Sequence, residues 1–108
     1  MKTQDVGYTE TLDTLVVSIC ADYERRRQAL NLLKCTPRTA MEYRYINMKI
    51  DEAAEEIAGE RLAPMYINEI GRKIGYAKSK VDCVSETTYK IEKQEIKINI
   101  AKKLHLLD

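Results

Sequence analysis

Polar side chains suited to binding an anion lie close together between positions 72 and 82 of the sequence. The six residues are Arg72, Lys73, Lys78, Ser79, Lys80 and Asp82. Lysine and arginine donate to phosphate oxygens, a serine hydroxyl donates or accepts, and a carboxylate accepts from the amine of cytosine. These residue types are therefore suited to contact with a nucleic acid, although the neighbouring carboxylates of Asp82 and Glu86 repel phosphate.

A helix-turn-helix over Ile67–Glu86 would place these side chains on one surface. Apolar residues recur at helical spacing on both sides of a glycine, at Ile70, Ile74, Val81 and Val84. Gly71 supplies a small residue where two helices cross closely, and Gly75 tolerates the left-handed backbone that a tight turn needs. We expect a second helix from about Ala77, with the lysines at its exposed leading edge. A structural corner without a role in DNA binding has the same pattern and remains an alternative.

The first half of the chain has the pattern of a helical hairpin. Apolar residues at helical spacing predict a helix from about Glu10 to Leu33. Thr36 followed by Pro37 is typical of a helix start, because the hydroxyl caps the helix and proline suits its first position. A second helix then runs to about Ala58, and two helices joined by a short turn pack antiparallel.

The second half has the pattern of a short helix followed by a long helical region. The short helix is expected at about Met65–Ile74, and residues 77–107 hold neither glycine nor proline. A strand within Glu95–Ala101 is the weaker interpretation, because helical spacing extends over a wider window. The sequence therefore predicts an all-α fold: an N-terminal helical hairpin, then a helix-turn-helix and a long C-terminal helix.

Charge is distributed unevenly along a chain whose net charge is only +1. Residues 1–60 carry eight basic and eleven acidic side chains, whereas residues 61–108 carry ten basic and six acidic ones. An anionic partner is therefore expected to bind the second half. We interpret residues 1–60 as a hairpin for interaction or dimerisation, and residues 61–108 as a DNA-binding region.

Candidate catalytic and metal-binding residues are few. His105 is the single histidine, and the three cysteines, Cys20, Cys35 and Cys83, are widely spaced and odd in number. A catalytic triad or a zinc site needs more ligands at closer spacing. The acidic cluster Glu52, Glu55 and Glu56 has the character of a solvated helix face. We therefore expect no enzyme activity, no cofactor and no metal.

The sequence has no sign of membrane insertion or secretion. No stretch approaches the roughly 18 consecutive apolar residues of a membrane-spanning helix, and the N-terminal residues are polar. A signal peptide would have an apolar stretch there. We therefore expect a cytoplasmic protein without a membrane partner, and its cysteines are expected to be reduced thiols.

The stretch Ile67–Leu107, with its core Ile-Gly-Arg-Lys-Ile-Gly-Tyr-Ala-Lys-Ser-Lys-Val, resembles region 4 of bacterial sigma factors. It is still more similar to small sigma-like regulators of phages and mobile elements in Gram-positive bacteria. The resemblance implies a sequence-specific transcriptional regulator that binds double-stranded DNA, with RNA polymerase as a candidate partner. It places Lys78, Ser79, Lys80 and Asp82 at recognition-helix positions.

The small number of bulky apolar residues favours a homodimer. The chain has seven tyrosines but no tryptophan or phenylalanine, so the core available to 108 residues is small. The first helical hairpin is the preferred interface, and the competing interface is a C-terminal row made of Ile96, Ile100, Leu104 and Leu107. The alternative function is a helical scaffold that binds protein, such as a phage assembly adaptor.

Overall fold

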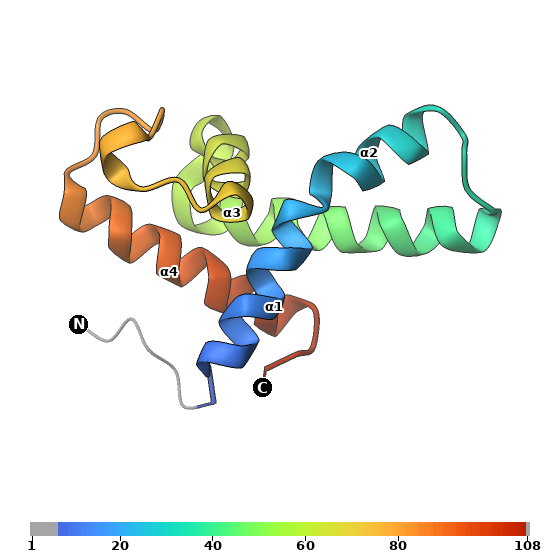
Figure 1. Cartoon of the computed structure of the whole chain (residues 1–108), viewed down its shortest axis with the longest axis horizontal. Helices are drawn as coiled ribbons and strands as arrows, with labels where there is room; N and C mark the ends of the chain where they lie inside the picture. The colour runs from blue at the N-terminus through green and yellow to red at the C-terminus, as the bar shows by residue number, and fades with distance from the viewer. Residues whose placement is uncertain (1–6, 108) are drawn as a thin grey trace.

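The computed structural model describes residues 7–107, which form helices joined by turns and one irregular segment (Figure 1). The elements are α1 (Glu10–Ala21), α2 (Tyr23–Asn31), α3 (Pro37–Arg72), the 3-10 turn η1 (Tyr76–Lys78) and α4 (Glu86–Lys103). No strand occurs among these residues, and the alternating isoleucines after Glu95 lie inside α4. The predicted all-α class and the long C-terminal helix are confirmed.

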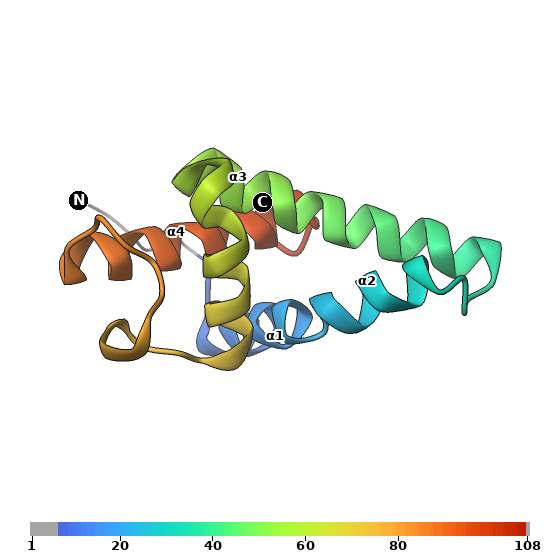
Figure 2. The same cartoon turned by 90° about the horizontal axis from the view of Figure 1, so that it is seen from above.

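The N-terminal hairpin is also present. α1 and α2 are separated by a bend at Asp22, and α3 returns beside them (Figures 1 and 2). Thr36 caps α3 by accepting from the backbone N–H of Thr39, and Pro37 occupies the first turn, as the sequence predicted. Buried Arg26 holds α2 to α3, because its guanidinium donates to Asn47 Oδ1 at 2.7 Å.

Helix α3 changes direction at Gly59, whose backbone has φ 84° and ψ 164°. Glycine adopts this conformation without the steric cost that a side chain would add. We call residues 37–58 the first segment of α3 and residues 60–72 the second segment. Figure 2 shows the second segment crossing the first at a steep angle. The sequence signal of a helix end near Ala58 therefore marked this bend.

One cluster of buried residues takes side chains from both halves of the chain. It includes Val16, Cys20, Ile50, Ala53, Ala54, Tyr66, Ile67, Ile70, Tyr89, Ile96 and Ile100. These residues come from α1, both segments of α3 and α4. Ile96 and Ile100 are fully buried inside the protomer, so they do not form the C-terminal dimer interface that the sequence offered as an alternative.

A close helix crossing occurs at Gly71, although not with the partner that the sequence suggested. A Cβ atom at this position would lie 2.8 Å from backbone atoms of Ala21 in α1. The expected partner was a second helix beginning near Ala77. Gly71 thus permits close packing of α1 against the second segment of α3.

The structure differs from the sequence prediction over residues 77–85. We expected a helix there, but η1 is followed by an irregular segment, and α4 starts at Glu86. Gly75 has φ −89°, and the left-handed residue that ends α3 is Lys73 with φ 57°. Cys83 also has a positive φ. The expected α-helix from about Ala77 is therefore absent, and the next α-helix after α3 is α4.

Candidate nucleic-acid interface

The second segment of α3 and the first half of α4 pack against each other at one end of the molecule. The rings of Tyr66 and Tyr89 stack with their centroids 5.5 Å apart. The Tyr66 hydroxyl donates to the Glu92 carboxylate at 2.7 Å. Figure 2 shows the two helices crossing steeply, as they do in a helix-turn-helix. Stacked rings and a hydrogen bond across the crossing fix the relative position of the two helices.

A buried carboxylate, Glu69, connects this helix pair to the segment between η1 and α4. Its Oε1 atom accepts from the Ser79 hydroxyl at 2.6 Å and from the Tyr89 hydroxyl at 2.7 Å. Its Oε2 atom accepts from the backbone N–H of Lys80 at 2.7 Å. Burial, reinforced by Glu69, raises the pKa of Tyr89 to about 12, so this phenol remains a donor at neutral pH. The segment is therefore fixed to the helices by hydrogen bonds to one side chain.

These hydrogen bonds explain why residues 79–85 are not helical. The backbone N–H of Lys80 is satisfied by Glu69, and that of Val81 by the Ser79 hydroxyl at 2.9 Å. Such side-chain partners replace the bonds that a helix would supply. Val81 is buried, and Val84 packs against the same core. Their three-residue spacing therefore results from core packing of an irregular segment and not from a helix.

Four of the six residues predicted to contact nucleic acid have exposed basic side chains. Arg72 and Lys73 end α3, Lys78 lies in η1, and Lys80 follows it. Their side chains make no hydrogen bond or ion pair with any part of the chain that the structure describes. These cationic groups are therefore available to an anionic partner.

The other two predicted residues have internal partners. Ser79 is half-buried, and its hydroxyl both donates to Glu69 and accepts from Val81. Asp82 is paired with Arg61 at 2.9 Å, where both side chains are exposed. Ser79 therefore helps to hold the irregular segment in place. The negative charge of Asp82 is balanced by Arg61.

Sequence reasoning did not identify the beginning of α4 as part of the site. Ser85 caps this helix by accepting from the backbone N–H of Thr88. Glu86, Thr87 and Lys90 are exposed in the first two turns, and Lys90 pairs with Glu86 at 2.9 Å. Ser85 before an apolar-periodic stretch is a typical N-cap signal, and this signal could have located the helix start.

Two further lysines with positive charge, Lys93 and Lys97, lie within α4. Lys93 and Lys97 line a hollow of about 230 Å³ together with Lys73 and Asp13. Lys97 pairs with Asp13 at 2.8 Å, and the Lys93 ammonium donates to the Ile74 carbonyl. Burial and the nearby Lys97 lower the pKa of Lys93. Residues 72–97 hold seven basic and four acidic side chains, so the net charge of this end is positive.

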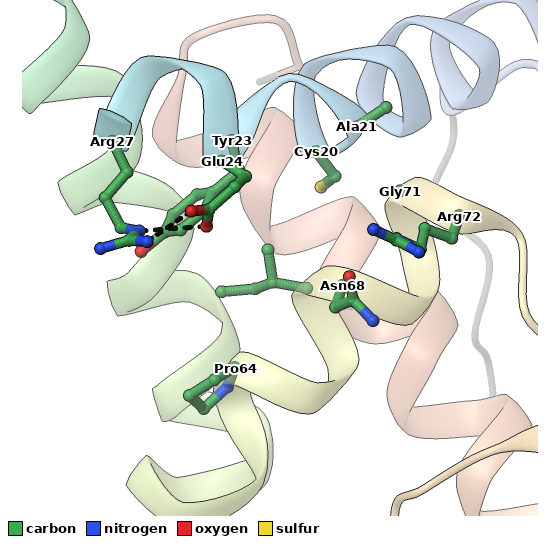
Figure 3. A pocket seen from close by; sticks show the side chains of 10 residues that line it. Cys20, Ala21, Tyr23, Glu24, Arg27, Pro64, Asn68, Gly71 and Arg72 are labelled. Carbon is green, nitrogen blue, oxygen red and sulfur yellow. Dashed lines mark hydrogen bonds and ion pairs between the residues drawn. The ribbon is translucent and has the colours of Figure 1, made fainter. Parts of the chain in front are cut away.

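A second hollow lies between the junction of α1 with α2 and the second segment of α3 (Figure 3). It measures about 550 Å³, and its lining includes Cys20, Tyr23, Arg27, Asn68 and Arg72. Burial raises the pKa of the Cys20 thiol to about 12, so this sulfur is not a thiolate at neutral pH. In the described residues, no group of three or more His, Cys, Asp or Glu side chains could hold a metal ion.

Comparisons with protein-family models, curated proteins and solved structures found no match for this chain. Within residues 7–107, no helix combines the length and the apolar character needed to cross a membrane.

Proposed function

We propose that this chain is a sequence-specific DNA-binding transcriptional regulator, in which the second segment of α3 and α4 form a helix-turn-helix with a long turn. The observation that carries the proposal is the exposed start of α4, which lies in an end of the molecule rich in unpartnered basic side chains. The recognition helix is accordingly assigned to the first turns of α4 and not to residues 77–84.

The expected docking follows the general geometry of helix-turn-helix proteins. The N-terminal residues of the second helix contact base edges in the major groove, while the first helix contacts the DNA backbone. In this chain, Thr87 and Lys90 would face the bases. The N-terminus of α4 adds the favourable dipole of a helix end for a phosphate group.

The irregular segment takes the place of the usual three- or four-residue turn. Lys78 and Lys80 would contact phosphates on one side of the groove, with Arg72 and Lys73 contributing from the end of α3. Glu69 keeps this segment in one position, so less conformational entropy is lost on binding. Asp82 remains neutralised by Arg61 and repels phosphate less than an unpaired carboxylate would.

The resemblance to sigma region 4 and to regulators of phages and mobile elements favours the same class of function, although it placed the recognition helix at Lys78, Ser79, Lys80 and Asp82 and not at the start of α4. It adds RNA polymerase as a candidate partner, and the cytoplasm is the compartment proposed from the residues themselves. A homodimer is part of the proposal, because a single helix-turn-helix contacts only a few base pairs and doubling the half-site increases specificity.

A salt titration of DNA affinity tests this function. The parent should bind double-stranded DNA with an affinity that falls steeply as salt rises, because binding releases counterions. Replacing Lys78 and Lys80 together by alanine should reduce the salt slope by roughly two units, about 0.9 for each phosphate that is no longer neutralised. The matched control replaces Arg25 and Arg27, which are exposed on α2.

The possible outcomes test the DNA-binding function and the location of the interface separately. Absence of salt-dependent DNA binding by the parent would refute the proposed function. An unchanged slope in the Lys78 and Lys80 variant would instead remove the irregular segment from the interface. A pull-down of genomic fragments should return one defined site if binding is sequence-specific.

A protein-binding adaptor is the second candidate, and a specific surface favours it. Large apolar side chains are exposed on the hairpin, at Leu32, Leu33, Met41, Tyr45 and Met48. Leu33, at the tip, is 87% exposed. Several large apolar side chains exposed on one hairpin favour an interaction site over scattered single residues.

A further inference from the structure

The outer face of the first segment of α3 carries a regular stripe of residues. The stripe consists of Arg38, Met41, Tyr45, Met48, Glu52 and Glu55. The steps between successive members are three, four, three, four and three residues, which is the spacing of a coiled-coil seam. Its three apolar members are 67%, 41% and 48% exposed in chain order. We call this set the outer stripe.

Helix α2 packs on the opposite face of the same segment, so it leaves the outer stripe uncovered. Tyr23 donates to Asp51 at 2.8 Å, and Arg26 donates to Asn47 at 2.7 Å. Positions 47 and 51 lie on the side of the helix away from Tyr45, given 3.6 residues per turn. Figure 1 shows this hairpin extending away from the start of α4.

Charge changes sign along the outer stripe. Its N-terminal end has Arg38, near Lys34 and Arg44, whereas residues 51–60 hold five acidic and no basic side chains. Within the chain, Arg38 lies 3.9 Å from Glu42, and Glu52 pairs with Lys49 at 3.4 Å. Lys103 from α4 pairs with Glu56 at 2.7 Å and lies 3.9 Å from Glu52. Glu55 has no ion-pair partner among the described residues. One end of the stripe is therefore basic, the middle is apolar and the other end is acidic.

We propose that two copies of this chain pair through their outer stripes, with the two α3 helices antiparallel and a two-fold axis near Tyr45. This inference deepens the homodimer part of the proposed function and rests on it. Antiparallel pairing places Met41 against Met48 of the partner subunit, and it places Arg38 against Glu52 of the partner subunit. The same patch serves both copies, as a two-fold interface requires.

Parallel pairing of the same stripes is unfavourable. It would put Arg38 beside Arg38 of the partner subunit, and the acidic ends would likewise lie together. Like charges at close range repel, whereas the antiparallel arrangement converts both ends into attractive pairs. The seam extends over only about five helical turns, so we expect a smaller interface than the standard of roughly 800 Å² per partner. The dimer should therefore depend on concentration.

Sedimentation velocity across the micromolar range tests this pairing. The mass of the parent should rise towards that of a dimer, and Tyr45→Glu should raise the dimer Kd by at least about tenfold because it buries a charge at the axis. Leu15→Glu is the matched control, since Leu15 is 44% exposed but lies outside the stripe. Circular dichroism should show that both variants keep the helical content of the parent.

A charge exchange provides a stricter test of the ends. Arg38→Glu should weaken the dimer, and adding Glu52→Arg to the same chain should restore it, because both ends of the seam then carry reversed but complementary charges. Monomeric parent protein at all concentrations would overturn the inference. Weakening by Leu15→Glu with no effect of Tyr45→Glu would also overturn it.

Cysteine cross-linking tests the orientation. In a chain with Cys35→Ser and Cys83→Ser, antiparallel pairing predicts that Tyr45→Cys forms a disulfide with itself. Met41→Cys should cross-link with Met48→Cys but not with another copy of itself. Self-pairing of Met41→Cys would indicate parallel helices and overturn the proposed arrangement.

DNA binding is measured on the same variants, so that the two proposals can fail separately. A monomeric parent that binds DNA in a salt-dependent way would overturn the pairing but not the proposed function. A dimer with the predicted cross-links that binds no DNA would support the pairing and refute the function.

Discussion

Glu69 is the residue on which the geometry of the candidate interface depends. A carboxylate with 2% of its surface exposed accepts three hydrogen bonds from groups on two different segments. Burying a polar group is costly unless hydrogen bonds compensate, and here the donors are a hydroxyl, a phenol and a backbone N–H. The carboxylate therefore stabilises a backbone path that no local sequence preference would select.

Glu69→Ala should destabilise the protein by roughly 3 kcal/mol, because one buried and two partly buried hydrogen-bond donors lose their acceptor. Urea unfolding gives this free energy, and Glu55→Ala on the exposed stripe should change it by no more than about 0.5 kcal/mol. DNA affinity should fall together with stability, because Lys78 and Lys80 lose their fixed position. A variant as stable as the parent would show that the carboxylate network contributes little.

The two glycines near the end of α3 have different structural requirements. A Cβ on Gly71 would approach the backbone of Ala21 to 2.8 Å, whereas a Cβ on Gly75 would meet no atom within 4 Å. Gly75 also has φ −89°, which any residue adopts. The sequence suggested that both glycines were needed, and the structure keeps this requirement for Gly71.

Gly71→Ala should destabilise the fold by about 1–3 kcal/mol, because α1 must move away from the second segment of α3. Gly75→Ala should instead stabilise the protein by about 0.4–1 kcal/mol, because it restricts the unfolded chain without native strain. Thermal unfolding of the two variants side by side gives the comparison. Equal destabilisation by both changes would mean that Gly75 has the backbone strain that the sequence suggested.

At the scale of whole elements, helix starts and the bend of α3 could be predicted from short local patterns. Thr36 with Pro37 predicted the start of α3, and Gly59 marked its bend. Residues 77–85 could not be predicted, because their path depends on hydrogen bonds to Glu69, a tertiary contact that periodicity does not include. Of the candidate site, the four free basic residues were identified, but the start of α4 was missed.

Helix α4 has one feature that opposes its proposed role. Glu86 is exposed in the first turn, pairs with Lys90 and would lie close to DNA phosphates. Glu86→Gln should therefore raise DNA affinity by roughly threefold to tenfold at low salt, since it removes repulsion and frees Lys90. Fluorescence anisotropy measures the change.

Glu42→Gln provides the control, because it removes the same charge from an exposed position in the first segment of α3. If both variants raised affinity equally, the gain would reflect net charge and would not place α4 at the interface. A fall in affinity with Glu86→Gln would indicate that this carboxylate accepts from a cytosine amine instead.

At the scale of the whole molecule, the outer stripe begins near the tip of the hairpin, and the proposed DNA-binding surface begins at the start of α4. The start of α4 and the tip of the hairpin are far apart in both views of the molecule (Figures 1 and 2), whose longest extent is 43 Å. Pairing through the outer stripe would therefore leave each DNA-binding end free. A dimer of this kind presents two equivalent helix pairs to DNA.

The division of the sequence at residue 60 does not coincide with a division of the core. Tyr66, Ile67 and Ile70 belong to the same buried cluster as Val16 and Ile50. A fragment of residues 61–108 would therefore expose apolar surface that α1 and the first segment of α3 cover in the full chain. Such a short chain has too small a core to be stable by itself.

We therefore expect the fragment of residues 61–108 to be largely unfolded by circular dichroism and to lack sequence-specific DNA binding, even though it contains every proposed DNA contact. The full chain should unfold in one cooperative transition, with the same midpoint by circular dichroism and by tyrosine fluorescence. A helical fragment with its own cooperative transition would show that the second half is an independent domain. The hairpin would then be a separate interaction module. Dimerisation through the hairpin would in that case have no effect on the stability of the DNA-binding end.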